Sequence, residues 1–260
     1  METAIRLTGV TQVYVTKREA SLAVENITFD ADSGEFVSLV GPSGCGKTTI
    51  LSMIAGLIQP VEGVVEIFGQ PVDGPSPKVG YMLQQDYLFP WRTIWDNCLI
   101  GLELMNRRTK EKEEYVLHLL KEMGLAEHRE NMPSELSGGM RQRVALVRTL
   151  ATEPDVLLLD EPFSALDYQT KLQLEDLIVE TLRAHNKTAL LVTHDLSEAI
   201  AMSDRVLVLD TKPGRVRKGF VIPTPIREAI PFQAREKEGF HELFRDVWRE
   251  IEAADGKGGN

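Results

Sequence analysis

The chain has 260 residues, of which 43% are hydrophobic and 26% are charged, and its formal net charge at pH 7 is −10. This composition is typical of a folded globular protein and excludes a disordered chain. The acidic balance argues against a protein that coats nucleic acid, because phosphate backbones attract basic patches, although it permits a local phosphate pocket.

Apolar patterning predicts strands and helices in alternation along most of the chain. Residues 1–30 alternate in the manner of strands, while residues 48–57 and about 93–152 show helical spacing, with a break at 133–139. The Pro- and Gly-rich residues 70–78 predict a loop. Apolar runs bounded by turn residues predict further strands at residues 36–40, 64–68, 79–83, 156–159, 188–193 and 206–209. Strands that alternate with helices favour a mostly parallel sheet covered on both faces.

The last part of the chain becomes strongly charged after residue 214. Apolar residues in it recur at helical spacing, namely Phe240, Leu243, Phe244, Val247, Trp248 and Ile251. The spacing predicts an amphipathic helix over about 236–253, which we expect to pack on its own domain; a regulatory or dimer contact is the alternative. The closing residues 256–260 predict a disordered tail.

The cysteines and the N-terminus indicate a reducing compartment. Cys45 and Cys98 are too few for the disulfide framework of a small secreted protein. The first ten residues lack the basic start and apolar stretch of a signal peptide. The long uncharged run at 48–61 is too short to span a bilayer, so we expect any membrane partner to be a separate chain.

One glycine-rich segment gives the strongest chemical signal. It follows the strand at 36–40, precedes a helix, matches G-x-x-x-x-G-K-[ST], and reads Gly41-Pro42-Ser43-Gly44-Cys45-Gly46-Lys47-Thr48. Glycines let successive backbone N–H groups point at an anion, and the helix start adds positive potential. We predict a phosphate nest that includes Thr49, in which Lys47 reaches the β- and γ-phosphates and the Thr48 hydroxyl coordinates Mg²⁺.

A second acidic element complements the nest. Leu157, Leu158 and Leu159 lead into Asp160 and Glu161, so an apolar strand ends in two carboxylates. We predict that Asp160 orients the metal and that Glu161 polarises the attacking water. Little else is needed for phosphoryl transfer than positioning, a metal and charge stabilisation.

The nucleotide-binding family is indicated by one absent motif and one present motif. The N-K-x-D motif of GTPases is absent, because Asn186-Lys187 is followed by Thr188 and Ala189. The run LSGGMRQR at residues 136–143 closely resembles the signature motif of ABC ATPases. Its Ser137, Gly138 and Gly139 open a predicted helix and form a second anion site.

The other motifs of that family follow in order, and the resemblance covers about residues 1–215. They are Tyr14, which matches the aromatic that stacks on adenine, Gln84 after a strand, Ser164-Ala165-Leu166-Asp167 after the acidic strand, and His194 in LLVTHD. The resemblance implies an α/β P-loop NTPase (RecA-like) fold. Its mostly parallel sheet core carries an N-terminal antiparallel β subdomain and an inserted helical subdomain at about 88–152, and residues 216–260 are a C-terminal extension.

The same resemblance implies an ATPase with ATP and Mg²⁺ as cofactors. Lys47, Glu161 and His194 are then catalytic, with Glu161 as general base and His194 in contact with the γ-phosphate. Gln84 joins Thr48 and Asp160 around Mg²⁺. It further implies a head-to-tail dimer, in which the Ser137–Gly139 site of one copy grips the γ-phosphate of ATP bound to the other, and Asp167 contacts the opposite copy.

Two classes of ABC ATPase remain open at this point. The gap of about ninety residues between the two glycine motifs is short for the insertions of DNA-handling members, and the acidic balance disfavours nucleic acid. The predicted function is therefore a peripheral transporter subunit at the cytoplasmic face of the cell membrane. It would work with separate permease subunits and, indirectly, a solute-binding protein; the alternative is a soluble ATPase that acts on DNA or another macromolecular machine.

Two further hypotheses concern single segments. Leu88-Phe89-Pro90-Trp91 resembles the nitrate/sulfonate/taurine importer subfamily. The resemblance implies that the chain powers an importer for a small solute of that type, and that these residues form an apolar groove for a permease helix; ordinary packing is the alternative for the groove. Cys45 lies in the nest near a helix start that can lower a thiol pKa, so oxidation or alkylation there is predicted to block ATP. A small space-filling residue is the alternative.

Overall fold

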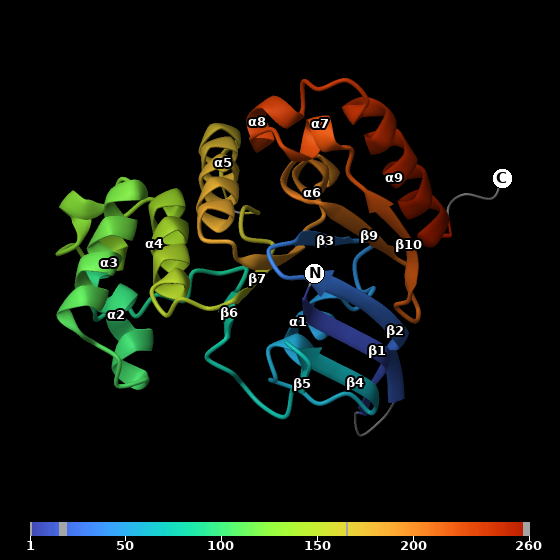
Figure 1. The fold of residues 1–260 in the computed structure, drawn as a ribbon, viewed down its shortest axis with the longest axis horizontal. Helices are drawn as coiled ribbons and strands as arrows, with labels where there is room; N and C mark the ends of the chain where they lie inside the picture. Colours follow the sequence, from blue (N-terminus) through green and yellow to red (C-terminus); the bar gives the residue numbers. More distant parts are fainter. Residues whose placement is uncertain (1, 16–19, 165, 257–260) are drawn as a thin grey trace.

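The computed structural model describes residues 2–15, 20–164 and 166–256. The predicted tail residues 257–260 and Ala165 lie outside the described residues. In this part of the chain the strands form two sheets, and the predicted α/β fold is confirmed (Figure 1).

The smaller sheet is antiparallel and has the order β2-β1-β4-β5. Its strands are β1 (Thr3–Val15), β2 (Ala20–Asp32), β4 (Glu62–Ile67) and β5 (Gln70–Pro71). β5 is a short strand inside the segment predicted as a loop. Alternating burial along β1 and β2 explains why period-two patterning was visible in residues 1–30.

The larger sheet has the order β10-β9-β3-β8-β7-β6, and all its described neighbouring pairs are parallel except β10 with β9. Its strands are β3 (Phe36–Val40), β6 (Val79–Met82), β7 (Val156–Asp160), β8 (Thr188–Val192), β9 (Arg205–Leu209) and β10 (Val216–Val221). β3, β7 and β8 are buried along their whole length, as parallel strands covered on both faces are. This is why they appear as continuous apolar runs.

The described helices surround the larger sheet or form a separate lobe beside it. They are α1 (Lys47–Ile54), α2 (Ile94–Leu104), α3 (Lys110–Glu122), η1 (Ala126–His128), η2 (Pro133–Glu135), α4 (Gly138–Leu150), α5 (Tyr168–Ala184), α6 (Leu196–Met202), α7 (Thr224–Arg227), α8 (Pro231–Ala234) and α9 (Phe240–Ala254). In Figure 1, α2, α3 and α4 form a lobe at one end of the molecule. α1 packs in a core shared by the two sheets.

The chain after residue 215 continues the main sheet before it becomes helical. The sequence predicted no strand there, yet Val216–Val221 pairs with β9 as the edge strand β10. α9 begins at Phe240 rather than near 236, after Gly239 with a φ of 86°. Its apolar face packs on its own domain, since Phe240 and Val247 are buried with residues of α6 and β9. Trp248 remains 48% exposed.

Candidate nucleotide-binding site

The glycine-rich loop at residues 41–46 joins the buried strand β3 to helix α1. Gly44 and Gly46 have φ angles of 79° and 90°, in the left-handed region that favours glycine. A Cβ on Gly46 would lie 2.2 Å from Cγ1 of Val24, whereas a Cβ on Gly44 would have nothing within 4 Å. The loop is therefore pressed against β2 at Gly46 and is open at Gly44.

Gly46→Ala should lower the free energy of unfolding by about 2 kcal/mol or more, because left-handed strain of roughly 1–2 kcal/mol adds to the overlap with Val24. Gly44→Ala is the matched control and should lose only the strain, about 1 kcal/mol. Urea unfolding followed by circular dichroism measures both values. Equal losses in the two variants would contradict the contribution of the Val24 contact.

Lys47, the first residue of α1, folds its side chain back over the loop. Its Nζ donates to the carbonyl oxygens of Gly41 at 2.8 Å and Pro42 at 3.1 Å, and it lies 3.5 Å from Sγ of Cys45. The residue is 8% exposed. The loop therefore holds one cation in place before any anion arrives.

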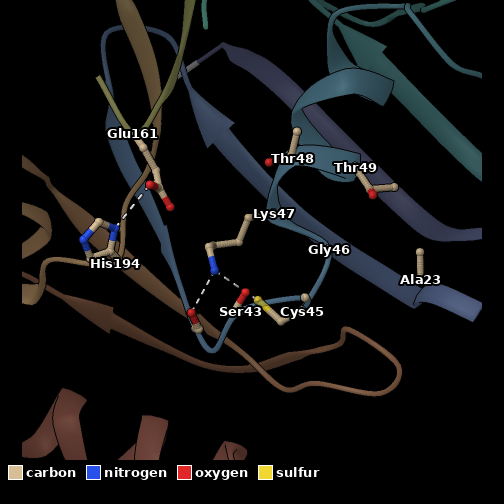
Figure 2. A pocket seen from close by; sticks show the side chains of 11 residues that line it. Ala23, Ser43, Cys45, Gly46, Lys47, Thr48, Thr49, Glu161 and His194 are labelled. Carbon is tan, nitrogen blue, oxygen red and sulfur yellow. Dashed lines mark hydrogen bonds and ion pairs between the residues drawn. The ribbon is translucent and has the colours of Figure 1, made fainter. Parts of the chain in front are cut away.

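A cavity of about 470 Å³ opens above this loop (Figure 2). The residues that line it are Ala23, Gly41, Ser43, Gly44, Cys45, Gly46, Lys47, Thr48, Thr49, Glu161 and His194. Figure 2 shows Glu161 and His194 on the side of Lys47 opposite Thr49. The structure thus brings the predicted nest and two predicted catalytic side chains around one space. Pro42 is not among the lining residues, although its carbonyl accepts a hydrogen bond from Lys47.

Asp160, at the end of β7, is the buried carboxylate of the site and is 7% exposed. Burial raises its pKa, and hydrogen bonds from Thr48 and Tyr81 oppose that rise. Tyr81 Oη donates to Oδ2 of Asp160 at 3.3 Å, and burial beside this carboxylate raises the pKa of Tyr81. Tyr81 therefore stays protonated and holds Asp160 in place. Sequence reasoning missed it, because only the pairing of β6 with β7 brings the two together.

The oxygen ligands Thr48 and Asp160 suit Mg²⁺, which is commonly held by one or two carboxylates, phosphates and water. Among the described residues no group of three or more His, Cys, Asp or Glu side chains forms a metal cage. A site completed by nucleotide phosphates needs no such cage, so the residues present fit the metal.

Glu161 is the meeting point of two other predicted residues. Its Oε2 accepts a hydrogen bond from Nε2 of Gln84 at 3.1 Å and lies 3.3 Å from Nδ1 of His194. Its φ is 45°, and its backbone N–H donates to the carbonyl of Val192 at 2.8 Å. A strained backbone of this kind is found at functional sites. Here it turns the carboxylate out of the strand direction and toward the cavity.

Tyr14 lies at the edge of the site and does not line the cavity. Its hydroxyl is 3.3 Å from Oγ1 of Thr49, and 42% of the residue is exposed. The ring is therefore close to the nest and accessible to a base.

The predicted signature residues and Asp167 lie away from this cavity and are not among the residues that line it. Ser137 caps α4 and its Oγ accepts from the Met140 backbone N–H at 3.3 Å, and Gly138 and Gly139 begin that helix. Asp167 caps α5, where a hydrogen bond from Thr170 lowers its pKa. The described chain therefore holds the two glycine motifs at separate places.

The signature helix α4 is tied to the segment after Gln84, a link that sequence reasoning missed. Gln142 Nε2 donates to the Gln84 carbonyl at 3.1 Å. Arg141 Nε lies 2.9 Å from Oδ2 of Asp86, and Arg148 donates to the carbonyls of Asp86 and Tyr87. The polar side chains of α4 are evident in the sequence, but the residues that they bind lie 55 to 62 positions earlier in the chain.

Cys45 is fully buried and is a free cysteine. Its sulfur packs against Gly41 and the Lys47 ammonium. The prediction that oxidation or alkylation of Cys45 blocks ATP binding stays a prediction. Because the thiol is buried, it must first become accessible to the reagent.

Comparison with known proteins identifies the chain's relatives. The family model for the ABC transporter domain matches residues 24–164. YtlC, an ABC transporter ATP-binding protein of Bacillus subtilis, is 51% identical over 95% of both chains. The nitrate import ATP-binding protein NrtD of Synechocystis is 40% identical over 87% of this chain and 85% of its own. The aliphatic sulfonates import ATP-binding protein SsuB of Bacillus cereus is 36% identical over 95% and 96%.

Solved structures agree with these relatives. The post-hydrolysis dimer of the ATP-binding cassette MJ0796, bound to ADP and phosphate, superposes with a TM-score of 0.75 at 31% identity. The match covers 84% of this chain and 99% of that one. The motifs, the fold and the relatives agree: the chain belongs to the ABC transporter family, as one of its ATP-binding proteins, and is an ATPase.

Proposed function

We propose that this chain powers an ABC importer for a small solute of the nitrate, sulfonate or taurine type by hydrolysing ATP. The observation that carries the proposal is that Lys47, Glu161 and His194 line one cavity together. The names of the import relatives supply the direction of transport and the solute class. They give no support to a DNA-handling ATPase.

In the proposed reaction each side chain has one task. The nest binds the phosphates, with Lys47 at the β- and γ-phosphates. Glu161 accepts the proton of the water that attacks the γ-phosphorus, as the bond to the β-phosphate oxygen breaks and ADP leaves. His194 contacts the γ-phosphate and the water, and Tyr14 stacks on adenine. Mg²⁺, when bound by Thr48, Asp160 and Gln84, supplies charge neutralisation at the phosphates.

The proposed working unit is a head-to-tail pair of identical chains. Ser137, Gly138 and Gly139 lie outside the cavity of their own chain, yet they start a helix whose free N–H groups suit an anion. In a pair, they would close over the γ-phosphate held by the other copy's nest, and the exposed Asp167 would contact that copy. Residues 1–215 would form the ATPase unit, with a helical subdomain at about 88–152 and the extension 216–260.

Separate permease subunits are the proposed membrane partners, with a solute-binding protein acting through them. In the described residues, none of the helices has the length and apolar character needed to cross a membrane. Large apolar side chains nevertheless face solvent near the helical lobe, since Tyr87 is 59%, Trp91 70% and Leu104 80% exposed. Such exposure suits a contact with a permease helix, which would place the chain at the cytoplasmic face of the membrane.

Trp91→Ala should leave the ATPase activity of the separate subunit unchanged and lower its recovery with the permease at least about tenfold, as expected of a central aromatic anchor. The Trp91 ring lies tilted against Phe89, with ring centroids 5.4 Å apart. Because Trp91 is largely exposed, its loss removes surface rather than core. Trp248→Ala, on the exposed side of α9, is the matched control. If the Trp91→Ala variant assembled with the permease and coupled hydrolysis to transport normally, the proposed permease contact at Trp91 would be contradicted.

The proposed function is tested by transport. The neighbouring genes should encode a permease and a solute-binding protein, which can be co-expressed with this chain and placed in vesicles. ATP-dependent uptake of labelled nitrate, taurine or an alkanesulfonate is the expected result. DNA-stimulated hydrolysis without any permease partner would contradict it.

A further inference from the structure

A largely buried cluster of charged side chains lies next to the proposed catalytic pair, Glu161 and His194. We call it the Lys171 cluster, and its members are Lys171 and Glu175 of α5, Asp195 and Glu198 at the start of α6, and Arg235 after α8. Lys171 Nζ lies 2.6 Å from Oδ2 of Asp195, 2.9 Å from Oε2 of Glu198 and 3.9 Å from Oε1 of Glu175. Arg235 Nη2 lies 2.6 Å from Oε2 of Glu175. Three carboxylates thus share two cations.

Burial makes the charge balance of this cluster sensitive. Glu175 is fully buried and Glu198 is 3% exposed. One oxygen of each, Oε1, accepts no hydrogen bond from any residue that the structure describes. Burial raises the pKa of Glu175, and it raises the pKa of Glu198 to about 7. A further uncompensated negative charge would be costly here, because buried ions need partners.

The cluster connects to His194 through the next residue. Asp195 Oδ1 accepts from the backbone N–H groups of Ser197 at 2.8 Å and Glu198 at 3.2 Å, and so caps α6. The Asp195 N–H in turn donates to Oγ1 of Thr193 at 3.0 Å. Both residues that flank His194 are therefore fixed. A cavity of about 130 Å³ has Lys171, Asp195, Glu198, Glu161 and His194 in its lining, so the cluster and the proposed catalytic pair border the same space.

The His194 side chain itself is held loosely. It is 68% exposed, and its polar contact within the described part of the chain is the one with Glu161. Its position consequently depends on its backbone, which Asp195 anchors through Lys171.

We propose that Arg235 is a positioning residue for His194, because its pairing with Glu175 leaves Lys171 free to hold Asp195 and the His194 backbone. The C-terminal extension then contributes to the ATPase site from outside the cassette motifs. This inference rests on the catalytic role proposed above for His194.

Arg235→Met tests the proposal in the full chain. Without Arg235, Glu175 is left with Lys171 as its nearest cation, which should draw the ammonium away from Asp195. We expect kcat for ATP hydrolysis to fall about tenfold, as a small displacement of a reacting group commonly causes. KM for ATP should change less than about twofold, since the nest is untouched.

Charge removal provides the rescue. Glu175→Gln in the Arg235→Met background removes the carboxylate that competes for Lys171 and should restore kcat to within about twofold of the parent. If Arg235 only anchored the C-terminal segment, the double variant would be as slow as Arg235→Met. That result would overturn the proposal.

Arg183→Met is the matched control. Arg183 also fastens α5 to the C-terminal segment, by donating to the carbonyls of Arg227 and Ala229, but it is not in the Lys171 cluster. Its loss should leave kcat unchanged. An equal fall in kcat for Arg183→Met and Arg235→Met would mean that any loosening of the C-terminal segment from α5 slows turnover, and it would overturn the proposal.

A readout independent of turnover separates this inference from the proposed function. Histidine-labelled NMR spectra, assigned with His194→Ala, should show the His194 resonance shifted in Arg235→Met, restored in the double variant and unchanged in Arg183→Met. If His194→Ala turned over ATP at the wild-type rate, the proposed catalytic role of His194 would be contradicted, whatever the NMR result. An unmoved His194 resonance in Arg235→Met would sink the positioning role.

Discussion

Glu161→Gln should lower ATP turnover about a thousandfold while ATP still binds, within the range that loss of a general base causes. The amide keeps the size of the carboxylate and its place between Gln84 and His194, but it cannot accept the proton of the attacking water. The nest, including Lys47, is unchanged. Binding and chemistry should therefore separate cleanly in this variant.

Phosphate release under saturating ATP measures the turnover, and equilibrium binding of labelled ATP measures the affinity. Glu180→Gln, on the exposed surface of α5, is the control and should behave like the parent. Retention of more than about a tenth of the activity by Glu161→Gln would assign the general base to another group.

Lys47→Ala should weaken ATP binding at least about a hundredfold, which corresponds to ~2.8 kcal/mol. The Lys47 ammonium is the cation among the cavity-lining residues that the loop carbonyls hold in place. Charge-assisted contacts to phosphate oxygens are stronger than neutral ones. Removal of this cation leaves the backbone N–H groups of the loop to bind the triphosphate alone.

Calorimetric titration with ATP measures this loss. Lys78→Ala is the matched control, because the Lys78 ammonium lies over the ring of Phe68, away from the cavity. Thermal unfolding of Lys47→Ala without nucleotide separates a lost ligand contact from a collapsed loop. Parent-like affinity in a folded Lys47→Ala would show that the nest is not the phosphate site.

The site elements that could be predicted from sequence are those whose chemistry is local. Residues 41–48 are contiguous and form one loop, so the nest and the role of Lys47 can be predicted without any tertiary information. Asp160 and Glu161 end a strand that is buried along its length, which places them at the sheet edge once the sheet is inferred to be parallel.

Residues that act through distant partners could not be predicted in this way. Tyr81 reaches Asp160 only because β6 is the neighbour of β7, and the order of strands is not written in either segment. Arg235 meets Glu175 across 60 positions of sequence. Because the segment after residue 214 is rich in charged residues, nothing in the sequence distinguishes Arg235 from an ordinary surface arginine.

The edge strand β10 was missed for a related reason. Arg217, Lys218 and Gly219 are all exposed, and this strand pairs on one side alone in the described sheet. Charged edges of this kind are common in β-sheets because they discourage aggregation. They also remove the apolar pattern by which a strand is recognised, whereas α9 kept its pattern because one face packs on the domain.

The enclosure of ATP by two copies is tested most directly by sedimentation in saturating ATP. Two samples are compared: the Glu161→Gln variant and the double variant that carries Glu161→Gln and Ser137→Arg. The first should sediment as a dimer with one ATP per chain. The second should bind ATP through its intact nest and remain a monomer, because the arginine blocks the site offered to the other copy. An ATP-loaded monomer in the first sample, or identical dimers in both, would contradict the shared site.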